Sequence, residues 1–121
     1  MAIYHMQAKV VSRSSGRSAV AASAYMSCSR MYNDYDGIQH DYTRKQGLIY
    51  QEVMLPPMAP SEWNDREQLW NAVEETEKTK DSRLAREFVV ALPVELDKDS
   101  NISLLQNFIQ KNFVDMGMYA D

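Results

Sequence analysis

Residues 4–25 read YHMQAKVVSRSSGRSAVAASAY, and this stretch predicts a strand, a basic turn and a helix in succession. Apolar and polar side chains alternate over residues 3–11, which is typical of a half-buried strand. The apolar face of this strand carries Tyr4, Met6, Ala8 and Val10. The opposite face is mostly polar and carries His5 and Lys9.

The basic turn, residues 13–17, leads into a stretch of small side chains. Ser14 or Ser15 is expected to cap the helix that follows. Residues 18–30 contain four alanines and no helix breaker, which predicts a helix over this range. Small neighbours at helical spacing are expected to leave the ring of Tyr25 accessible.

The remaining sequence predicts alternating strands and helices. The expected elements are a turn over 33–37, a strand over 48–55, a helix over 61–80, a strand over 84–92 and a helix from 99 or 100 to 116. We interpret Trp63 and Trp70 as core residues of the first of these helices, and Gly117 as the stop of the last. Residues 118–121 look like the start of another strand. The order predicts an α+β or α/β layer with helices packed on one sheet.

The composition is that of one small globular domain. The chain has 121 residues, 45% hydrophobic and 25% charged. The sequence shows no signal peptide and no apolar run near the ~20 residues that cross a bilayer, so we expect no membrane association. Cys28 has no second cysteine with which to form an internal disulfide, so a reducing, cytoplasmic location is expected.

Charge is distributed unevenly along a chain whose net charge is −4. Residues 1–45 carry six basic and three acidic side chains, whereas residues 46–121 carry seven basic and fourteen acidic ones. A local basic region binds phosphates over about one Debye length, ~8–10 Å, although the whole molecule is acidic. The alternative is a chance asymmetry in a short chain.

The chemistry that this opening permits is phosphoryl transfer to a tyrosine. The basic turn supplies backbone N–H groups at a helix N-terminus and the guanidinium groups of Arg13 and Arg17, all of which favour a phosphate. A tyrosine hydroxyl, with an ordinary pKa near ~10, becomes a nucleophile once it is deprotonated or oriented. The alternative interpretation of Tyr25 is a half-buried helix residue that only packs.

Three blocks in order resemble the MobA/MobL family of plasmid mobilization relaxases. The first runs from Tyr4 to Tyr25, the second is HDYTRK at residues 40–45 followed by Gly47, and the third covers residues 84–93, LAREFVVALP. The resemblance covers essentially the whole chain. It implies an α+β, relaxase-type (HUH-like) palm, an antiparallel sheet flanked by helices, with residues 1–121 as the N-terminal portion of the relaxase domain.

The resemblance also implies a reaction and its residues. Tyr25 would attack the nic phosphodiester of the transfer origin, leaving a free 3′-hydroxyl and a 5′-phosphotyrosyl strand. Glu87 matches the first acidic position of the third block, with a role as general base or metal neighbour; Val89 stands where the family usually has a second acidic residue. The expected partners are single-stranded origin-of-transfer DNA and accessory relaxosome proteins. The expected DNA-binding residues are His5, Lys9, Arg13, Ser14, Gly16, Arg17, Arg44 and Lys45.

Alternatives exist for these assignments. His5 is otherwise a structural histidine, and Glu87 a surface or edge carboxylate. The family holds Mg²⁺ or Mn²⁺ through three histidines in a later segment, and His5 and His40 do not match those positions, so we expect no metal on residues 1–121 alone. The alternative function is therefore a catalytically inactive fragment with at most weak single-strand binding. An unrelated α+β domain would need three coincidental matches.

Overall fold

The computed structural model describes residues 5–77 and 79–121, with only the backbone of His5. The strands are β1 (His5–Ser12), β2 (Arg30–Asn33), β3 (Ile38–Asp41) and β4 (Arg83–Ala91), and the α-helices are α1 (Ala19–Ser27), α2 (Arg66–Thr76) and α3 (Lys98–Asn112). Short 3-10 helices cover Arg13–Ser15, Ser61–Asn64 and Val114–Met116. The predicted strand positions Ile3 and Tyr4 lie outside the described residues.

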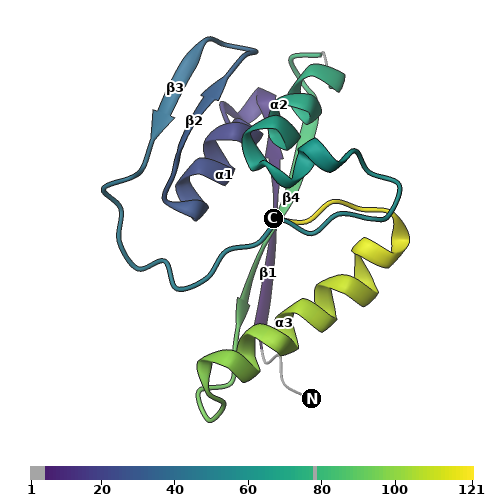
Figure 1. Ribbon diagram of the computed structural model, residues 1–121. Helices are drawn as coiled ribbons and strands as arrows, with labels where there is room; N and C mark the ends of the chain where they lie inside the picture. The colour runs from purple at the N-terminus through teal and green to yellow at the C-terminus, as the bar shows by residue number, and fades with distance from the viewer. Residues whose placement is uncertain (1–4, 78) are drawn as a thin grey trace.

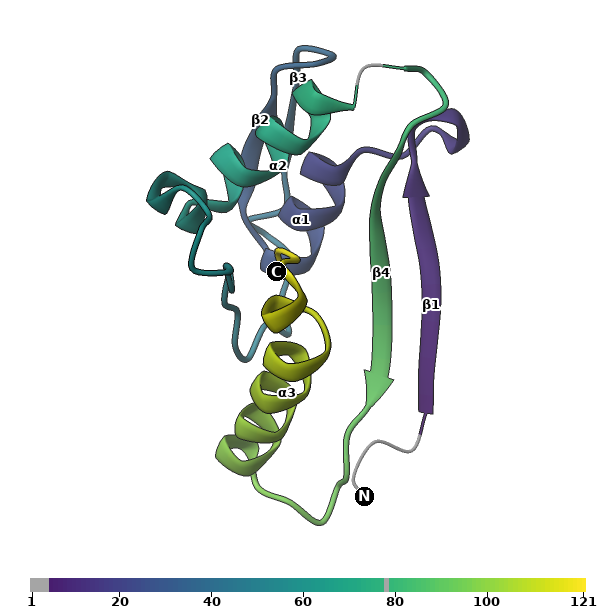
Figure 2. The same cartoon turned by 90° about the vertical axis from the view of Figure 1, so that its right-hand side faces the viewer.

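The strands form two antiparallel ladders, which confirms the predicted antiparallel pairing. β1 pairs with β4, and β2 pairs with β3 as a hairpin. Figure 1 shows α1 between the hairpin and the long β1–β4 ladder. Figure 2 shows that α1 and α3 both lie on the β4 side of that ladder, one above the other. The basic turn joins β1 to α1, and its residues Gly16 and Arg17 line pockets together with Asp36 of the hairpin.

The core takes the face of β1 that the sequence pattern did not predict. Val11 is 1% exposed and packs with Ala19 of α1 and Leu84 of β4. Met6 and Val10, predicted on the apolar face, are 46% and 45% exposed. The prediction was wrong because α1 covers the strand face that carries Val11, where two strands and one helix meet.

Helix α1 is shorter than predicted and has a different cap. Ser18 is its N-cap, because its hydroxyl accepts a hydrogen bond from Ala21 N, so the prediction of Ser14 or Ser15 was wrong. The helix ends at Cys28, whose φ of 53° is left-handed. That conformation turns the chain directly into β2, which starts where the predicted helix was still running. The four alanines made the helix clear, but no glycine marked its end.

A carboxylate also fixes the middle of α1. Ser23 Oγ donates to Asp121 Oδ2 at 2.6 Å, and Trp70 Nε1 of α2 donates to the same oxygen at 2.9 Å. Arg66 of α2 completes the group with a bidentate ion pair to Asp121. Trp70 also packs against the buried clusters on both sides of α1, as the sequence predicted for a core residue. These contacts join α1 to α2 through the carboxylate of Asp121.

The segment after β3 departs most from prediction. Residues 48–55, predicted as a strand, contain only an isolated bridge between Met54 and Ala120. Ile49 is 71% exposed, so its apolar character does not reflect burial in a sheet. The β2–β3 hairpin was not predicted, because its strands are four residues long and largely polar. The predicted helix over 61–80 is interrupted at Asp65, which caps α2.

β4 and α3 follow the predicted bounds closely. Phe88 of β4 lies 5.3 Å from Phe113 between ring centroids, and Phe108 of α3 lies 6.1 Å from the same ring, which attaches α3 to the ladder. No residue of α3 is fully buried. Gly117, with φ of 90°, ends the last 3-10 helix as predicted. Within the described residues, no helix combines the length and the apolar character that a membrane span needs.

Candidate functional site

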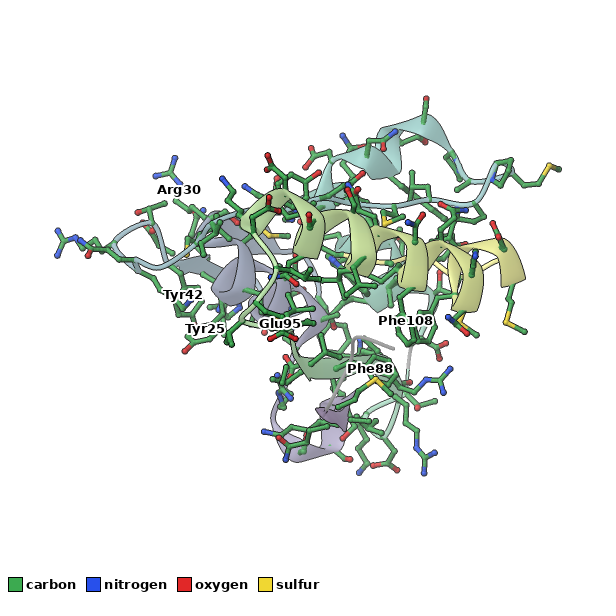
Figure 3. All side chains as sticks on the ribbon, turned by 90° about the horizontal axis from the view of Figure 1, so that it is seen from below. Tyr25, Arg30, Tyr42, Phe88, Glu95 and Phe108 are labelled. Carbon is green, nitrogen blue, oxygen red and sulfur yellow. The ribbon has the colours of Figure 1, made fainter. Side chains whose placement is uncertain are left out.

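Tyr25 projects from α1 with its side chain half accessible. It is 52% exposed, as expected from its small neighbours. Figure 3 shows the side chains of Tyr25 and Tyr42 next to each other, and their ring centroids are 5.2 Å apart in an edge-to-face arrangement. Lys45 Nζ lies 4.6 Å from the centroid of the Tyr25 ring, a cation–π contact. The second block of the sequence, residues 40–45, therefore folds onto the tyrosine of the first block.

Tyr25 lines a pocket of about 350 Å³ between α1, the hairpin and β4. The basic turn supplies Gly16 and Arg17, the hairpin supplies Asp36 and His40, and β4 supplies Glu87. All three blocks that the sequence singled out meet at this pocket. A phosphate in it would lie beside a tyrosine, a guanidinium group and a carboxylate.

Glu87 and Arg17 face each other across the pocket wall. Arg17 Nη2 lies 3.4 Å from Glu87 Oε2, and their side chains are 37% and 18% exposed. In the ladder, Glu87 stands opposite Lys9, whose side chain is exposed. The carboxylate thus has one cation beside it and a second on the adjacent strand.

Arg13 occupies a different environment from Arg17. Its side chain is 9% exposed and forms an ion pair with Glu74 at 2.9 Å. It also donates to the backbone carbonyls of Glu74 in the last turns of α2 and of Glu77 and Thr79, which follow that helix. Its guanidinium carbon lies 3.7 Å above the ring of Tyr35. Positive charge is favourable at a helix C-terminus. The guanidinium group of Arg13 is therefore directed into the protein, away from the Tyr25 pocket.

The other predicted DNA-binding residues lie around the pocket or outside it. Ser14 is exposed in the 3-10 helix of the basic turn, and Gly16 has a left-handed φ of 79°, which glycine adopts without strain. Arg44 is exposed and does not line the pocket. The backbone of His5 pairs with Ala91 at the far end of β1, and its side chain lies outside the described part of the structure.

Two residues in this region were not assigned a role from sequence. His40 lines the Tyr25 pocket, and its buried Nε2 has no hydrogen-bond partner among the described residues. Glu74 of α2 is 2% exposed and accepts hydrogen bonds from three segments. The block HDYTRK pointed to His40 by its position. Nothing local to α2 pointed to Glu74, because its partners are 41 to 61 residues away in the chain.

A carboxylate at the edge of the site has a perturbed pKa. Hydrogen bonds from Thr43, first from its side chain and then from its backbone, lower the pKa of Asp41 from its ordinary value. Nearby Arg30 and Arg44 act in the same direction. Asp41 therefore keeps its charge and fixes the turn that carries Lys45 toward Tyr25.

The described residues do not by themselves provide a metal-binding cluster. No group of three or more histidine, cysteine, aspartate or glutamate side chains gathers in the described part of the chain in a way that would hold a metal ion. Mg²⁺ and Mn²⁺ prefer several oxygen or imidazole ligands around one point. The described side chains near Tyr25 do not fit that requirement.

Comparison with known proteins identifies the family. The MobA/MobL family model matches residues 17–121. A conjugal transfer protein TraA of Agrobacterium fabrum is 42% identical over all of this chain, which spans 12% of that relative. A mobilization protein MobL of Acidithiobacillus ferridurans is 39% identical over the whole chain, which spans 31% of it. The chain is thus a minor part of the length of these relatives.

A solved structure supports the same assignment. A chain from work on the molecular basis of vancomycin resistance transfer in Staphylococcus aureus superposes with a TM-score of 0.85 at 42% identity, covering 90% of this chain and 56% of that one. The predicted relaxase-type α+β fold is thereby confirmed. Because the family model and the relatives cover nearly all of the sequence, the chain belongs to the MobA/MobL family of mobilization relaxases.

Proposed function

We propose that residues 1–121 form the N-terminal portion of a relaxase domain, and that Tyr25 is its nucleophile toward single-stranded DNA at a transfer origin. The main observation in support is that Tyr25, half exposed on α1, lines one pocket together with Arg17, His40 and Glu87. A tyrosine hydroxyl beside a guanidinium group and a carboxylate is a combination of groups that transfer of a phosphate to the hydroxyl requires.

The reaction exchanges one phosphodiester for another. Tyr25 Oη forms a bond to the scissile phosphorus, and the bond from phosphorus to the 3′-oxygen breaks. The phenol proton leaves with the attack, and the departing 3′-oxygen takes up a proton to become a hydroxyl. The product is a 5′-phosphotyrosyl strand, so no bond energy is lost to hydrolysis.

Glu87 is the side chain that we assign to the phenol proton. It lines the same pocket and is held by Arg17 at 3.4 Å, which fixes its orientation. In the bound state the phosphate competes for Arg17, and that exchange frees the carboxylate to accept a proton. His40 Nε2, which is buried without a partner among the described residues, is a further hydrogen-bonding group in the pocket wall.

The cationic groups around the pocket bind the DNA backbone. Arg17 is 37% exposed in the pocket, and Lys45 lies beside the nucleophile. Exposed Lys9 and Arg44 extend the basic surface beyond it. Exposed Ser14 adds a hydroxyl at the basic turn, whereas the backbone N–H groups of Gly16 and Arg17 already donate to the carbonyls of Arg13 and Ser12. Arg13 supports this surface from inside, because its own guanidinium group is engaged by α2.

A tyrosine pair of equal exposure tests the proposal. Tyr25→Phe in the complete reading frame that carries these residues should abolish the covalent adduct with origin DNA. Tyr35→Phe is the matched control, because Tyr35 is also 52% exposed but does not line the Tyr25 pocket. The measurement is a gel shift of denatured protein after incubation with the labelled origin strand. Adduct formation by the Tyr25 variant at the original rate would contradict the proposal.

A further inference from the structure

Glu74 is a buried charged residue that the proposed reaction does not use. It lies in the last part of α2 and is 2% exposed. A carboxylate is costly to bury unless its oxygens are hydrogen-bonded and its charge is paired. Both conditions are met here, because Arg13, which begins the basic turn, and Ser18, which follows it, each donate to the carboxylate of Glu74.

One oxygen of Glu74 holds the start of α1. Ser18 Oγ donates to Glu74 Oε2 at 2.6 Å while the same hydroxyl accepts from Ala21 N as the N-cap. Val20 N also donates to Oε2, at 3.4 Å. Asn33 Nδ2 donates to both Ser18 Oγ and Glu74 Oε2, at 3.0 and 3.3 Å. A negative charge beside a helix N-terminus is favourable, so the carboxylate stabilises α1 directly and through its cap.

The other oxygen of Glu74 holds the opposite side of the basic turn. Arg13 Nη2 donates to Glu74 Oε1 at 2.9 Å. The two ends of the segment from Arg13 to Ser18 are therefore attached to one side chain. Arg17, which lies between these ends, is left to face Glu87 and the pocket.

The position of Tyr25 depends on the contacts of Glu74 with Ser18 at the start of α1. Tyr25 lies seven residues after Ser18 on the same helix, about 10 Å along the axis. A short helix moves as a unit, so a shift at its N-terminus displaces the phenol relative to Glu87 on β4. A displacement of about 1 Å at a reacting group costs about 10²-fold in rate.

We propose that Glu74 is a positioning residue, which sets the place of Tyr25 through Ser18 and the place of Arg17 through Arg13. This inference rests on the proposed function of Tyr25. Helix α2 contributes no side chain to the Tyr25 pocket. Through Glu74 it would nevertheless fix the positions of Tyr25 and Arg17, which do line that pocket.

The test compares two ways of removing the attachment with one matched control. Ser18→Ala and Glu74→Gln are made in the complete reading frame. Asp97→Ala removes the equivalent N-cap of α3, far from the pocket. Ser18→Thr keeps both the hydroxyl cap and the donor to Glu74. Each variant is assayed for thermal melting, for its affinity for the labelled origin strand in a Tyr25→Phe background, and for the rate of adduct formation at saturating DNA.

Ser18→Ala and Glu74→Gln should lower the adduct rate at saturating DNA by about 10- to 100-fold. Ser18→Thr should restore the rate, and Asp97→Ala should lower the melting temperature without changing the rate. If folded Ser18→Ala and Glu74→Gln proteins react at the original rate, the inference is wrong. If Glu74→Gln does not fold, the comparison of the adduct rates of Ser18→Ala and Ser18→Thr decides whether the inference holds.

A second readout separates this inference from the proposed function. Amide hydrogen exchange over residues 20–25 should be faster in Ser18→Ala and Glu74→Gln than in Asp97→Ala. If Tyr25→Phe still forms adducts, the proposed nucleophile is wrong, and the exchange experiment still tests whether Glu74 holds α1. Unchanged exchange in both variants would overturn the positioning role whatever the outcome for Tyr25.

Discussion

The regions on the two sides of the basic turn hold their charges in opposite ways. On one side the side chains of Arg13 and Glu74 are 9% and 2% exposed and form an ion pair, although Arg13 Nε has no hydrogen-bond partner among the described residues. On the other side Arg17 and Glu87 are partly exposed and 3.4 Å apart, beside a half-exposed tyrosine. Buried, paired charges maintain structure, whereas partly exposed ones remain available to a substrate.

A pocket lies on each side of this turn, and the two are adjacent. The smaller, of about 180 Å³, is lined by Arg13 and Glu74 and shares Gly16, Arg17, Ser18 and Asp36 with the Tyr25 pocket. Arg17 therefore lines both pockets, whereas Arg13 lines only the smaller one. The comparison predicts that variants of Arg13 mainly lose stability and that variants of Arg17 mainly lose affinity for DNA.

The largest expected effect is on stability at Arg13. Arg13→Ala leaves Glu74 buried without its cation, and breaking such a pair costs about 3–5 kcal/mol of unfolding free energy. Arg17→Ala should cost less than about 1 kcal/mol, because its pair with Glu87 is partly exposed. Denaturant unfolding of both variants measures the difference. Equal losses would show that the two sides of the turn are not distinct.

The next largest effect is on the rate of adduct formation when Glu87 is changed. Glu87→Gln should slow adduct formation by about 10²-fold, because an amide cannot accept the phenol proton. The rate is measured at saturating DNA for both proteins. A variant with the original rate would remove Glu87 from the chemistry.

A smaller effect is expected on DNA affinity at Arg17. Arg17→Ala should weaken binding of the origin strand and reduce the salt dependence of the association constant by about one unit of slope. Arg13→Lys, which keeps the buried charge, is the control and should retain the original slope. Titrations at several salt concentrations give the slopes. A slope that falls only in the Arg13 variant would reverse the assignment of the two arginines.

The smallest expected effect is on the helical content at low pH, where the N-caps of α1 and α3 should behave differently. Hydrogen bonds from Ser100 lower the pKa of Asp97 below its ordinary value of 3.8. Its contribution to α3 is therefore present above pH 3.8 and is lost as the pH falls through the lowered pKa. Ser18 does not titrate, so its own cap contact should persist over that range. Helical circular dichroism with and without Asp97→Ala checks this, and an identical acid transition in the two proteins would contradict it.

Local patterns predicted the elements that carry the site. The basic turn, the Ala-rich helix and the strand of Glu87 are visible in sequence because each has its own periodicity or composition. Their meeting at one pocket is a finding of the structure. The family assignment itself is confirmed by the match over residues 17–121.

Long-range contacts explain what the sequence could not show. The buried face of β1 depends on where α1 packs, and a period-2 pattern with apolar residues on both faces cannot choose between them. Residues 48–55 have strand-like composition but meet only one bridge partner, Ala120. The burial of Arg13 depends on Glu74, which lies 61 residues later in the chain. The sequence of the basic turn therefore does not show that Arg13 is nearly buried while Arg17 stays partly exposed.

The most direct test of the account is to locate the covalent bond to DNA. The complete protein is incubated with the origin strand, digested, and the nucleotide-bearing peptide is sequenced by mass spectrometry. The account predicts that the nucleotide mass resides on Tyr25, in the peptide that follows Arg17. Attachment to another tyrosine, with Tyr25 unmodified, would contradict it.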